Sequence, residues 1–206
     1  MNQAHFASPA LKEAPKHERI IQAALRVFAE HGLHGTAVPP IAAEAGVGVG
    51  TLYRYFDGKE ALINAVFRDT KQRLQEHLLD GLDLMHPTRP LFNTLWARLT
   101  TFARQQPEAF QFLEMQDHHS YLNAESRSQE QALLIPLGMM VIIGQRTGLL
   151  SERMKPDLAI ALFWGAFVGV FKAERLGYLT LTDDDLERAR DACWLAIAAQ
   201  PGDTTP

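Results

Sequence analysis

Prolines and glycines divide this chain into segments with helical periodicity, and this punctuation constrains the fold more than any other feature. Prolines stand at or near four predicted helix starts, at Pro87, Pro90, Pro107 and Pro156. Glycines stand at two predicted ends, Gly148 and Gly177. Helices tolerate proline in their first turn and often end at glycine. Because strand-like alternation is nearly absent, the pattern predicts an all-α protein of about nine helices.

The apolar spacing places the predicted helices approximately. The first amphipathic segment, residues 16–31, ends at Gly32, and Thr36 is a candidate N-cap for the short helix that follows. We expect Gly46 to supply a left-handed turn after that helix, and Pro136 to kink or divide the helix that contains it. The expected helices are 16–31, a short helix reaching about residue 45, 49–55, 59–79, 89–105, 107–119, 126–147, 156–177 and 182–199.

Composition excludes several classes of protein. The single cysteine, Cys193, excludes an intramolecular disulfide framework and a multi-cysteine zinc site. The N-terminal residues lack the apolar core of a secretory signal, and the longest apolar run, residues 158–171, is shorter than the ~20 residues that span a bilayer. We therefore expect a soluble, cytoplasmic protein. The formal net charge is −4, so any nucleic-acid binding must depend on the placement of a few groups.

Residues 36–56 have the pattern of a helix-turn-helix. Two short helical segments flank a glycine turn, and their inward apolar positions are Ile41, Ala42, Ala45, Leu52 and Phe56. The outward side chains of the second segment are then Thr51, Tyr53, Arg54 and Tyr55. Hydroxyls, aromatic rings and a guanidinium suit a helix that lies in a major groove, where such groups meet phosphates and base edges. The alternative is a helical hairpin whose tyrosines pack at a domain junction.

The same residues resemble the signature of the tetracycline-repressor (TetR/AcrR) family of bacterial transcriptional regulators. The motifs that carry the resemblance are Ala-Gly-Val at 45–47, Gly-Thr-Leu-Tyr-Arg-Tyr-Phe at 50–56 and Lys-Glu-Ala-Leu at 59–62, within a match over residues 16–63. The resemblance implies a homodimer that represses transcription and releases its operator, an approximately palindromic double-stranded DNA site, when a small molecule enters the C-terminal domain. We expect no enzyme activity and no cofactor.

The resemblance also assigns roles to individual residues. Tyr53 and Lys59 match positions that grip the DNA backbone, and Thr36, Thr51 and Tyr55 match positions that contact phosphates or bases. Two positions depart from the family pattern: Gly48 stands where Ser or Thr often caps the recognition helix, and Val49 stands where a polar residue is common. Val49 contacts a thymine methyl at most, so direct base readout is reduced. We expect the DNA contacts at Thr36, Val49, Thr51, Tyr53, Arg54, Tyr55 and Lys59.

The central region is rich in aromatic residues and predicts either a packed core or a ligand pocket. On a helix starting at Pro107, Phe112, Met115 and His119 share one face, and Glu114 and His118 share another. A pocket here has apolar walls and few polar anchors, which favours a largely apolar organic effector. The candidate ligand contacts are Phe92, Trp96, Phe112, Met115, Gln116, His119, Trp164 and Phe167.

The last two predicted helices favour an interface between two copies of the chain. Small residues recur every four positions at Ala161, Gly165, Gly169 and Ala173, within a helix that is apolar all round. Such a helix is rarely covered on every side by its own protomer, and a four-helix contact across a two-fold axis satisfies it. The candidate interface is Ala161, Gly165, Val168, Gly169, Leu186, Cys193 and Ile197. The alternative is complete burial inside one protomer.

Other functions remain open alternatives. The residue types of a metal hydrolase occur at Glu114, Asp117, His118 and His119, but neither a His-Glu-x-x-His motif nor a Gly-x-Ser-x-Gly elbow is present. A metal-sensing regulator, or a helical binding module without DNA function, stays possible, and we expect no metal site. The expected organisation is a flexible arm over residues 1–14, a helix-turn-helix domain over 15–60, a ligand-binding and dimerisation domain over 61–200, and a disordered tail over 201–206.

Overall fold

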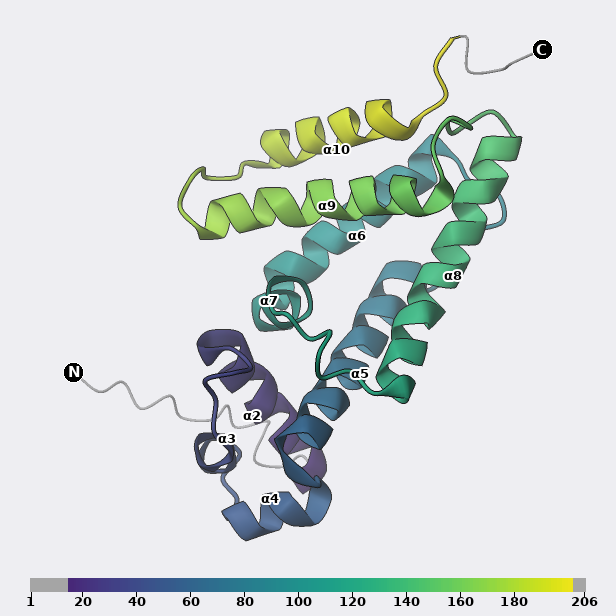
Figure 1. Ribbon diagram of the computed structural model, residues 1–206. Coiled ribbons are helices and arrows are strands. Elements are labelled where there is room, and N and C mark those ends of the chain that lie inside the picture. Colours follow the sequence, from purple (N-terminus) through teal and green to yellow (C-terminus); the bar gives the residue numbers. More distant parts are fainter. Residues whose placement is uncertain (1–14, 202–206) are drawn as a thin grey trace. The chain divides into compact units, whose positions relative to one another are not determined.

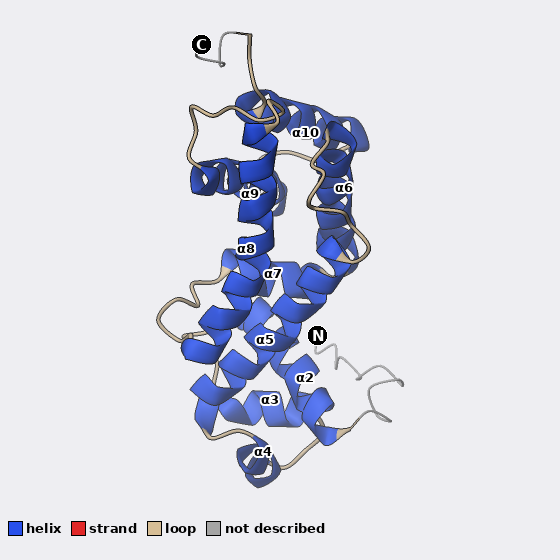
Figure 2. Cartoon of the chain, turned by 90° about the vertical axis from the view of Figure 1, so that its right-hand side faces the viewer, coloured by secondary structure: helices blue, strands red, loops and turns tan. Residues whose placement is uncertain are grey.

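A computed structural model describes residues 15–201, and helices make up most of this part of the chain (Figures 1 and 2). Its nine helices are α2 (Lys16–His31), α3 (Val38–Glu44), α4 (Val49–Tyr55), α5 (Gly58–Leu79), α6 (Arg89–Gln105), α7 (Pro107–Met115), α8 (Ala124–Arg146), α9 (Pro156–Arg175) and α10 (Asp183–Ile197). The all-α prediction is confirmed for these residues. The predicted N-terminal arm and all but the first residue of the predicted tail lie outside them.

The described residues form two compact units. Unit 1 consists of residues 15–74 and 105–129, and unit 2 consists of residues 75–104 and 130–201. Segment 105–129 therefore packs with the N-terminal helices, although the chain passes through α6 before reaching it. Helices α5 and α8 each contribute residues to both units.

Amphipathic spacing explains why unit 1 has a core. The inward side chains of α2 include Ile20, Ala24 and Phe28, all with 0% exposure, and Ile41 of α3 and Leu52 of α4 are equally buried. α2 packs against both α3 and α7. On the α7 side the rings of Phe28 and Phe112 stack with centroids 6.2 Å apart.

Three local expectations need correction. Thr36 does not cap α3, because the helix starts at Val38 with Ala37 as N-cap, and the Thr36 hydroxyl instead donates to the Gly32 carbonyl at 2.6 Å. Pro136 does not divide α8, which is one helix. α7 ends at Met115 rather than near residue 119, because Gln116 is extended and the Asp117 carboxylate accepts the His119 amide in a turn.

Side-chain caps set the starts of α8 and α10. α8 starts two residues earlier than expected, because Asn123 Oδ1 accepts the Ser126 amide at 2.9 Å. At α10, Thr182 and Asp185 form a reciprocal capping box. Both caps accept hydrogen bonds from backbone amides in the first turn that have no partner within the helix. The apolar periodicity of the sequence does not reveal such caps.

Candidate DNA-binding surface and effector pocket

The turn between α3 and α4 is closed by backbone hydrogen bonds that require a glycine. Gly46 has φ +65°, its amide donates to the Ala43 carbonyl, and the Val47 amide donates to the Ala42 carbonyl at 2.9 Å. This pair of bonds is a Schellman ending of α3. The predicted left-handed turn is present, and it sets the angle at which the chain enters α4.

Two arginines of α2 fix α3 and this turn, and sequence reasoning missed both. The Arg19 guanidinium donates to the Ala45 carbonyl at 2.7 Å and to the Gly46 carbonyl at 3.0 Å. Arg26 pairs with Glu44 at 2.9 Å. The carbonyls at the end of a helix have no intrahelical partner, so a guanidinium satisfies them well. Arginine one turn into an amphipathic helix gives no signal of such a role in the sequence.

α4 buries one side and presents the other to solvent. Leu52 is fully buried, whereas Tyr53 is 52% exposed, Tyr55 is 46% exposed and Val49 is 38% exposed. Arg54 is exposed and Thr51 is half-buried. The structure thus brings the predicted contact residues of this helix together on the outer side of α4. The face also holds His17 of α2, whose ring lies 5.1 Å from that of Phe56 and 6.0 Å from that of Tyr55.

The remaining predicted DNA contacts lie at the α2–α3 loop and the start of α5. Lys59 is half-buried, and its ammonium donates to the His34 carbonyl at 3.3 Å. Thr36 is 6% exposed, and its hydroxyl proton is used in the bond to Gly32. Lys59 is therefore available to a phosphate, whereas Thr36 stabilises the loop from inside.

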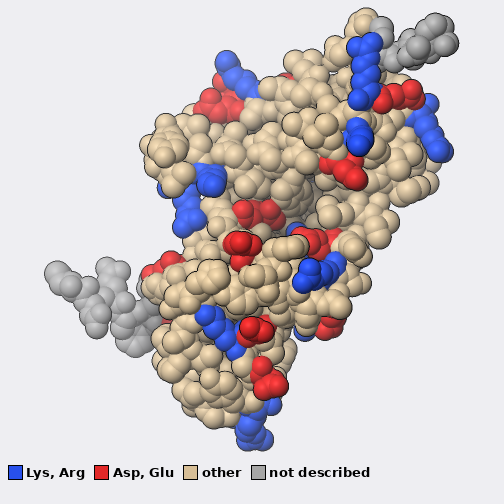
Figure 3. Space-filling model, viewed as in Figure 1, with Lys and Arg blue, Asp and Glu red and all other residues tan. Residues whose placement is uncertain are grey.

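Basic and acidic side chains are mixed on one face of the protein. On the face drawn in Figure 3, basic and acidic side chains alternate, and no large field of one sign is visible. This agrees with the net charge of −4. The drawn face therefore offers no bulk positive charge for non-specific attraction to DNA.

Unit 2 contains an apolar pocket between its own helices. The space between the lining side chains, counted together with open solvent at the mouth, is about 590 Å³. The wall is built from α5, α6, α8, α9, α10 and their connections. Its residues are Leu78, Pro87, Thr88, Phe92, Leu95, Leu137, Met140, Val141, Leu149, Leu150, Ala159, Ile160, Phe163, Trp194 and Ile197.

Arg89 places a positive charge beside two residues that line this pocket. Its guanidinium lies 4.7 Å from the ring centroid of Trp194 and 5.3 Å from that of Phe92. It pairs with Asp191, and its Nη1 atom has no hydrogen-bond partner within the described structure. The pocket wall itself is apolar, and a guanidinium with an unpartnered Nη1 contacts two of its lining residues, Phe92 and Trp194.

The predicted ligand residues are spread over several places. Phe92 lines the pocket of unit 2. Trp96 packs edge-on to Phe163 and Phe167 in the neighbouring aromatic cluster of α6 and α9. Four others belong to unit 1, where Phe112 is buried, Met115 and Gln116 are half-buried and His119 is exposed. Trp164 is half-buried on α9 and is not among the lining residues.

The expected helical pairing of the central residues is wrong, because α7 ends before the histidines. His118 is 6% exposed, while His119 is exposed. The described residues contain no group of three or more His, Cys, Asp or Glu side chains placed to hold a metal ion.

The predicted interface residues divide into two sets. Ala161, Gly165 and Gly169 lie on an exposed stripe of α9, and Val168 is half-buried. In contrast, Leu186, Cys193 and Ile197 of α10 are each 5% exposed, because they face the core of their own protomer. Burial raises the pKa of the Cys193 thiol to about 11, as befits a small apolar core residue.

α9 is unusually apolar for a helix with so exposed a face. Among the residues described, it is the helix whose length and composition would suffice to cross a membrane, yet only 17% of that window is buried inside the chain. Leu158 is 50% exposed and Leu162 is 39% exposed beside the small-residue stripe. The apolar surface of this helix thus lacks cover from its own protomer.

Comparisons with known proteins agree with this geometry. Residues 20–66 match the family described as bacterial regulatory proteins of the tetR family, and residues 67–199 match the tetracyclin repressor-like C-terminal domain. The HTH-type transcriptional repressor DhaR of Mycobacterium sp. (strain GP1) is 28% identical over 172 residues, which cover 80% of this chain and 86% of that protein. The fatty acid metabolism regulator protein of Bacillus subtilis (strain 168) is 39% identical over 71 residues, 34% of this chain and 37% of that protein.

A solved structure shows the same fold at low sequence identity. The transcriptional regulator FadR from Bacillus subtilis in complex with stearoyl-CoA aligns with a TM-score of 0.64 at 21% identity, over 87% of this chain and 96% of that one. The C-terminal match alone covers more than half of the chain, and the N-terminal match contains the helix-turn-helix described above. The chain belongs to the TetR family of DNA-binding transcriptional regulators, which are not enzymes.

Proposed function

We propose that this protein is a homodimeric, sequence-specific repressor that leaves its operator when a small, largely apolar organic molecule binds. The observation that carries the proposal is the outer side of α4. It exposes Tyr53, Arg54 and Tyr55 while Leu52 anchors the helix in the core. A regulator of this kind acts on DNA in the bacterial cytoplasm.

The residues of this surface have different tasks in the proposal. Tyr53 and Lys59 hold phosphates, which positions the protein without reading sequence. Thr51, Arg54 and Tyr55 read base edges, and Val49 contacts a thymine methyl. Thr36 acts indirectly, because its hydroxyl is committed to the loop that precedes α3.

We place the effector in the pocket of unit 2. Its wall is apolar, and the Arg89 guanidinium contacts two of the lining residues, so the pocket suits a ligand with an apolar body and at most a small anionic group. The bound stearoyl-CoA named for the Bacillus FadR structure is an amphiphile of this general kind.

We assign the dimer contact to the exposed stripe of α9. The exposed positions Leu158, Ala161, Gly165 and Gly169 follow one another at spacings of three and four residues, and exposed Leu162 lies four residues after Leu158 and three before Gly165. Because two glycines bring backbones close together, a second copy of the helix buries this stripe efficiently. Leu186, Cys193 and Ile197 support the stripe from inside the protomer.

The proposal is tested by DNA binding. Genomic fragments selected with the purified protein should contain an approximate palindrome whose half-sites lie about one helical turn, ~34–36 Å, apart. Lys59→Ala should weaken binding to all sequences alike and reduce the slope of log affinity against log salt by ~0.9. Lys172→Ala removes an exposed lysine of unit 2 and serves as the control. An unchanged salt slope for Lys59→Ala would show that this docking arrangement is wrong.

A further inference from the structure

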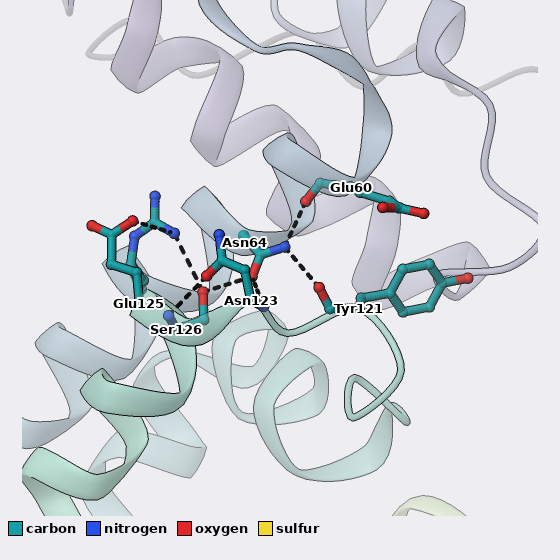
Figure 4. A network of polar contacts seen from close by, with 7 residues as sticks. Glu60, Asn64, Tyr121, Asn123, Glu125 and Ser126 are labelled. Atoms are coloured by element: carbon teal, nitrogen blue, oxygen red, sulfur yellow. Dashed lines mark hydrogen bonds and ion pairs between the residues drawn. The ribbon is translucent and has the colours of Figure 1, made fainter.

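A buried polar network holds a connection of unit 1 that lies outside the helix-turn-helix. Residues 116–123 join α7 to α8, and their anchor is Asn64 of α5, which is 4% exposed. The Asn64 side-chain amide donates to the Glu60 carbonyl at 2.9 Å and to the Tyr121 carbonyl at 2.8 Å (Figure 4). One bond is to its own helix, so the other fixes Tyr121 relative to α5.

The oxygen of Asn64 completes this network. Its Oδ1 accepts from the Asn123 amide at 2.9 Å and from the Ser126 hydroxyl at 2.7 Å. Ser126 has no solvent exposure. Asn64 thus uses both donor hydrogens and both acceptor positions of its amide group. A buried polar side chain with all its bonds made has one orientation, and it imposes that orientation on the residues it holds.

The side chain of Tyr121 extends from this anchor to the loop between α2 and α3. Its hydroxyl makes a 2.8 Å hydrogen bond with Nδ1 of His34, and the two rings lie 5.4 Å apart by their centroids. The His34 carbonyl accepts from the Lys59 ammonium at 3.3 Å. Four successive contacts therefore connect the first turn of α8 to Lys59, through Ser126, Asn64, Tyr121 and His34.

We infer that Tyr121 is a positioning residue for the DNA interface, which sets the Lys59 ammonium for its phosphate through His34. The inference rests on the proposed function of Lys59. A free lysine side chain samples many rotamers, and ordering it on DNA has an entropic cost. A carbonyl held in place by Tyr121 orders the ammonium beforehand and leaves its other hydrogens for a phosphate. Tyr121 lies outside the matched N-terminal family segment, residues 20–66.

The experiment compares Tyr121→Phe with and without Lys59. Affinity for a selected operator is measured by fluorescence anisotropy. Tyr121→Phe removes only the hydroxyl, and it should weaken binding about 2- to 10-fold, the effect of one lost hydrogen bond. In a Lys59→Ala background the same change should have no further effect, because its target is gone. His34→Ala should weaken operator binding by the same factor as Tyr121→Phe. The double variant should bind no more weakly than either single variant. Tyr178→Phe, at a tyrosine that is 79% exposed in unit 2, is the matched control.

The outcomes separate the inference from the proposed function. A general loosening of unit 1 would weaken binding by the same factor in both backgrounds, and that result would overturn the role of Tyr121. So would unchanged affinity of both Tyr121→Phe and His34→Ala in the otherwise unaltered protein, with circular dichroism showing that each is folded. If the unaltered protein binds no DNA, the proposed function fails, and the positioning role fails with it.

Discussion

His118 illustrates at the residue scale how tertiary packing changes the chemistry of a side chain. Its ring lies 4.7 Å from that of Phe112 and 5.5 Å from that of Phe67, centroid to centroid, and its Nε2 has no hydrogen-bond partner. Burial lowers the pKa of His118 from 6.5 to about 4, and the Lys71 charge acts in the same direction. The Phe112 carbonyl and Asp117 oppose this shift without cancelling it.

The lowered pKa predicts a pH dependence of stability. Between pH 6.5 and 4 the unfolded chain binds a proton at residue 118 and the folded chain does not, so acid favours unfolding. The free energy of unfolding should be independent of this group above pH 6.5. It should fall by on the order of 3 kcal/mol as the pH drops to 4, and this contribution should level off below. Urea titrations of the unaltered protein and of His118→Phe at several pH values measure the difference.

The control for this prediction is the neighbouring histidine. His119→Phe replaces an exposed ring and should leave the difference between pH 7 and pH 4 as it is. A protein with His118→Phe that loses as much stability in acid as the unaltered protein would refute the role of this ring.

At the scale of the element, α4 is held weakly at its start. Its N-cap, Gly48, has φ −72° and ψ 148°, and it offers no side-chain acceptor to the first amides of the helix. Any L-residue adopts these angles, and a Cβ here would meet only Thr51 Oγ1 at 3.9 Å. The family-typical serine therefore fits without rearrangement.

Replacing this cap should stabilise the protein. Gly48→Ser should raise the free energy of unfolding by roughly a few tenths of a kcal/mol, because the hydroxyl accepts an orphan amide of α4. Gly48→Ala adds the Cβ without an acceptor and should not be more stable than the glycine. Urea unfolding at one pH tests the order serine above glycine above alanine. If Gly48→Ala stabilised the protein as much as Gly48→Ser, the cause would be the lower conformational entropy of the unfolded chain and not the cap.

At the scale of the whole molecule, a substitution in the exposed stripe of α9 should affect the stability of the protomer and the formation of the dimer in opposite directions. No atom lies within 4 Å of a Cβ built on Gly165, so a larger side chain meets nothing inside the protomer. Gly165→Leu should raise the stability of the protomer, since leucine is the better helix former by up to ~1 kcal/mol. The same change should weaken the dimer, because it separates helices that approach at glycine.

Sedimentation velocity over a range of concentrations, together with unfolding curves, measures both effects. Ala97→Leu, at an exposed position of α6, adds similar apolar surface and should leave association unchanged. If the unaltered protein is a monomer at micromolar concentration, the proposed dimer does not exist.

Effector release is likewise a property of the whole molecule. A ligand shifts the protein off its operator only by its difference in affinity for the two conformations, and a coupling of ~1–3 kcal/mol weakens operator binding about 5- to 150-fold. Trp194 lines the pocket, so ligand binding should quench its fluorescence. Saturating operator should weaken ligand affinity by the same factor. Independent binding of the two would refute induction by that ligand.

The sequence by itself determined the features that depend on near neighbours in the chain. Apolar spacing placed α2, α4 and α6, and Gly46 marked the turn before α4, because helix periodicity and left-handed glycine are local properties. The outward side chains of α4 were predicted from the buried position of Leu52, because most of them lie within two residues of it in the sequence. The family motifs lie in this same short segment.

Tertiary structure alone decided the features that depend on partners far along the chain. Segment 105–129 packs with the N-terminal helices, so Phe112 and His118 belong to unit 1 rather than to the pocket with Phe92. Arg19 and Tyr121 act on backbone and side-chain groups 26 and 87 residues away. No periodicity records such contacts, because they form only when packing brings the two segments together, and the orientation of a buried polar group is then fixed by the partners available there.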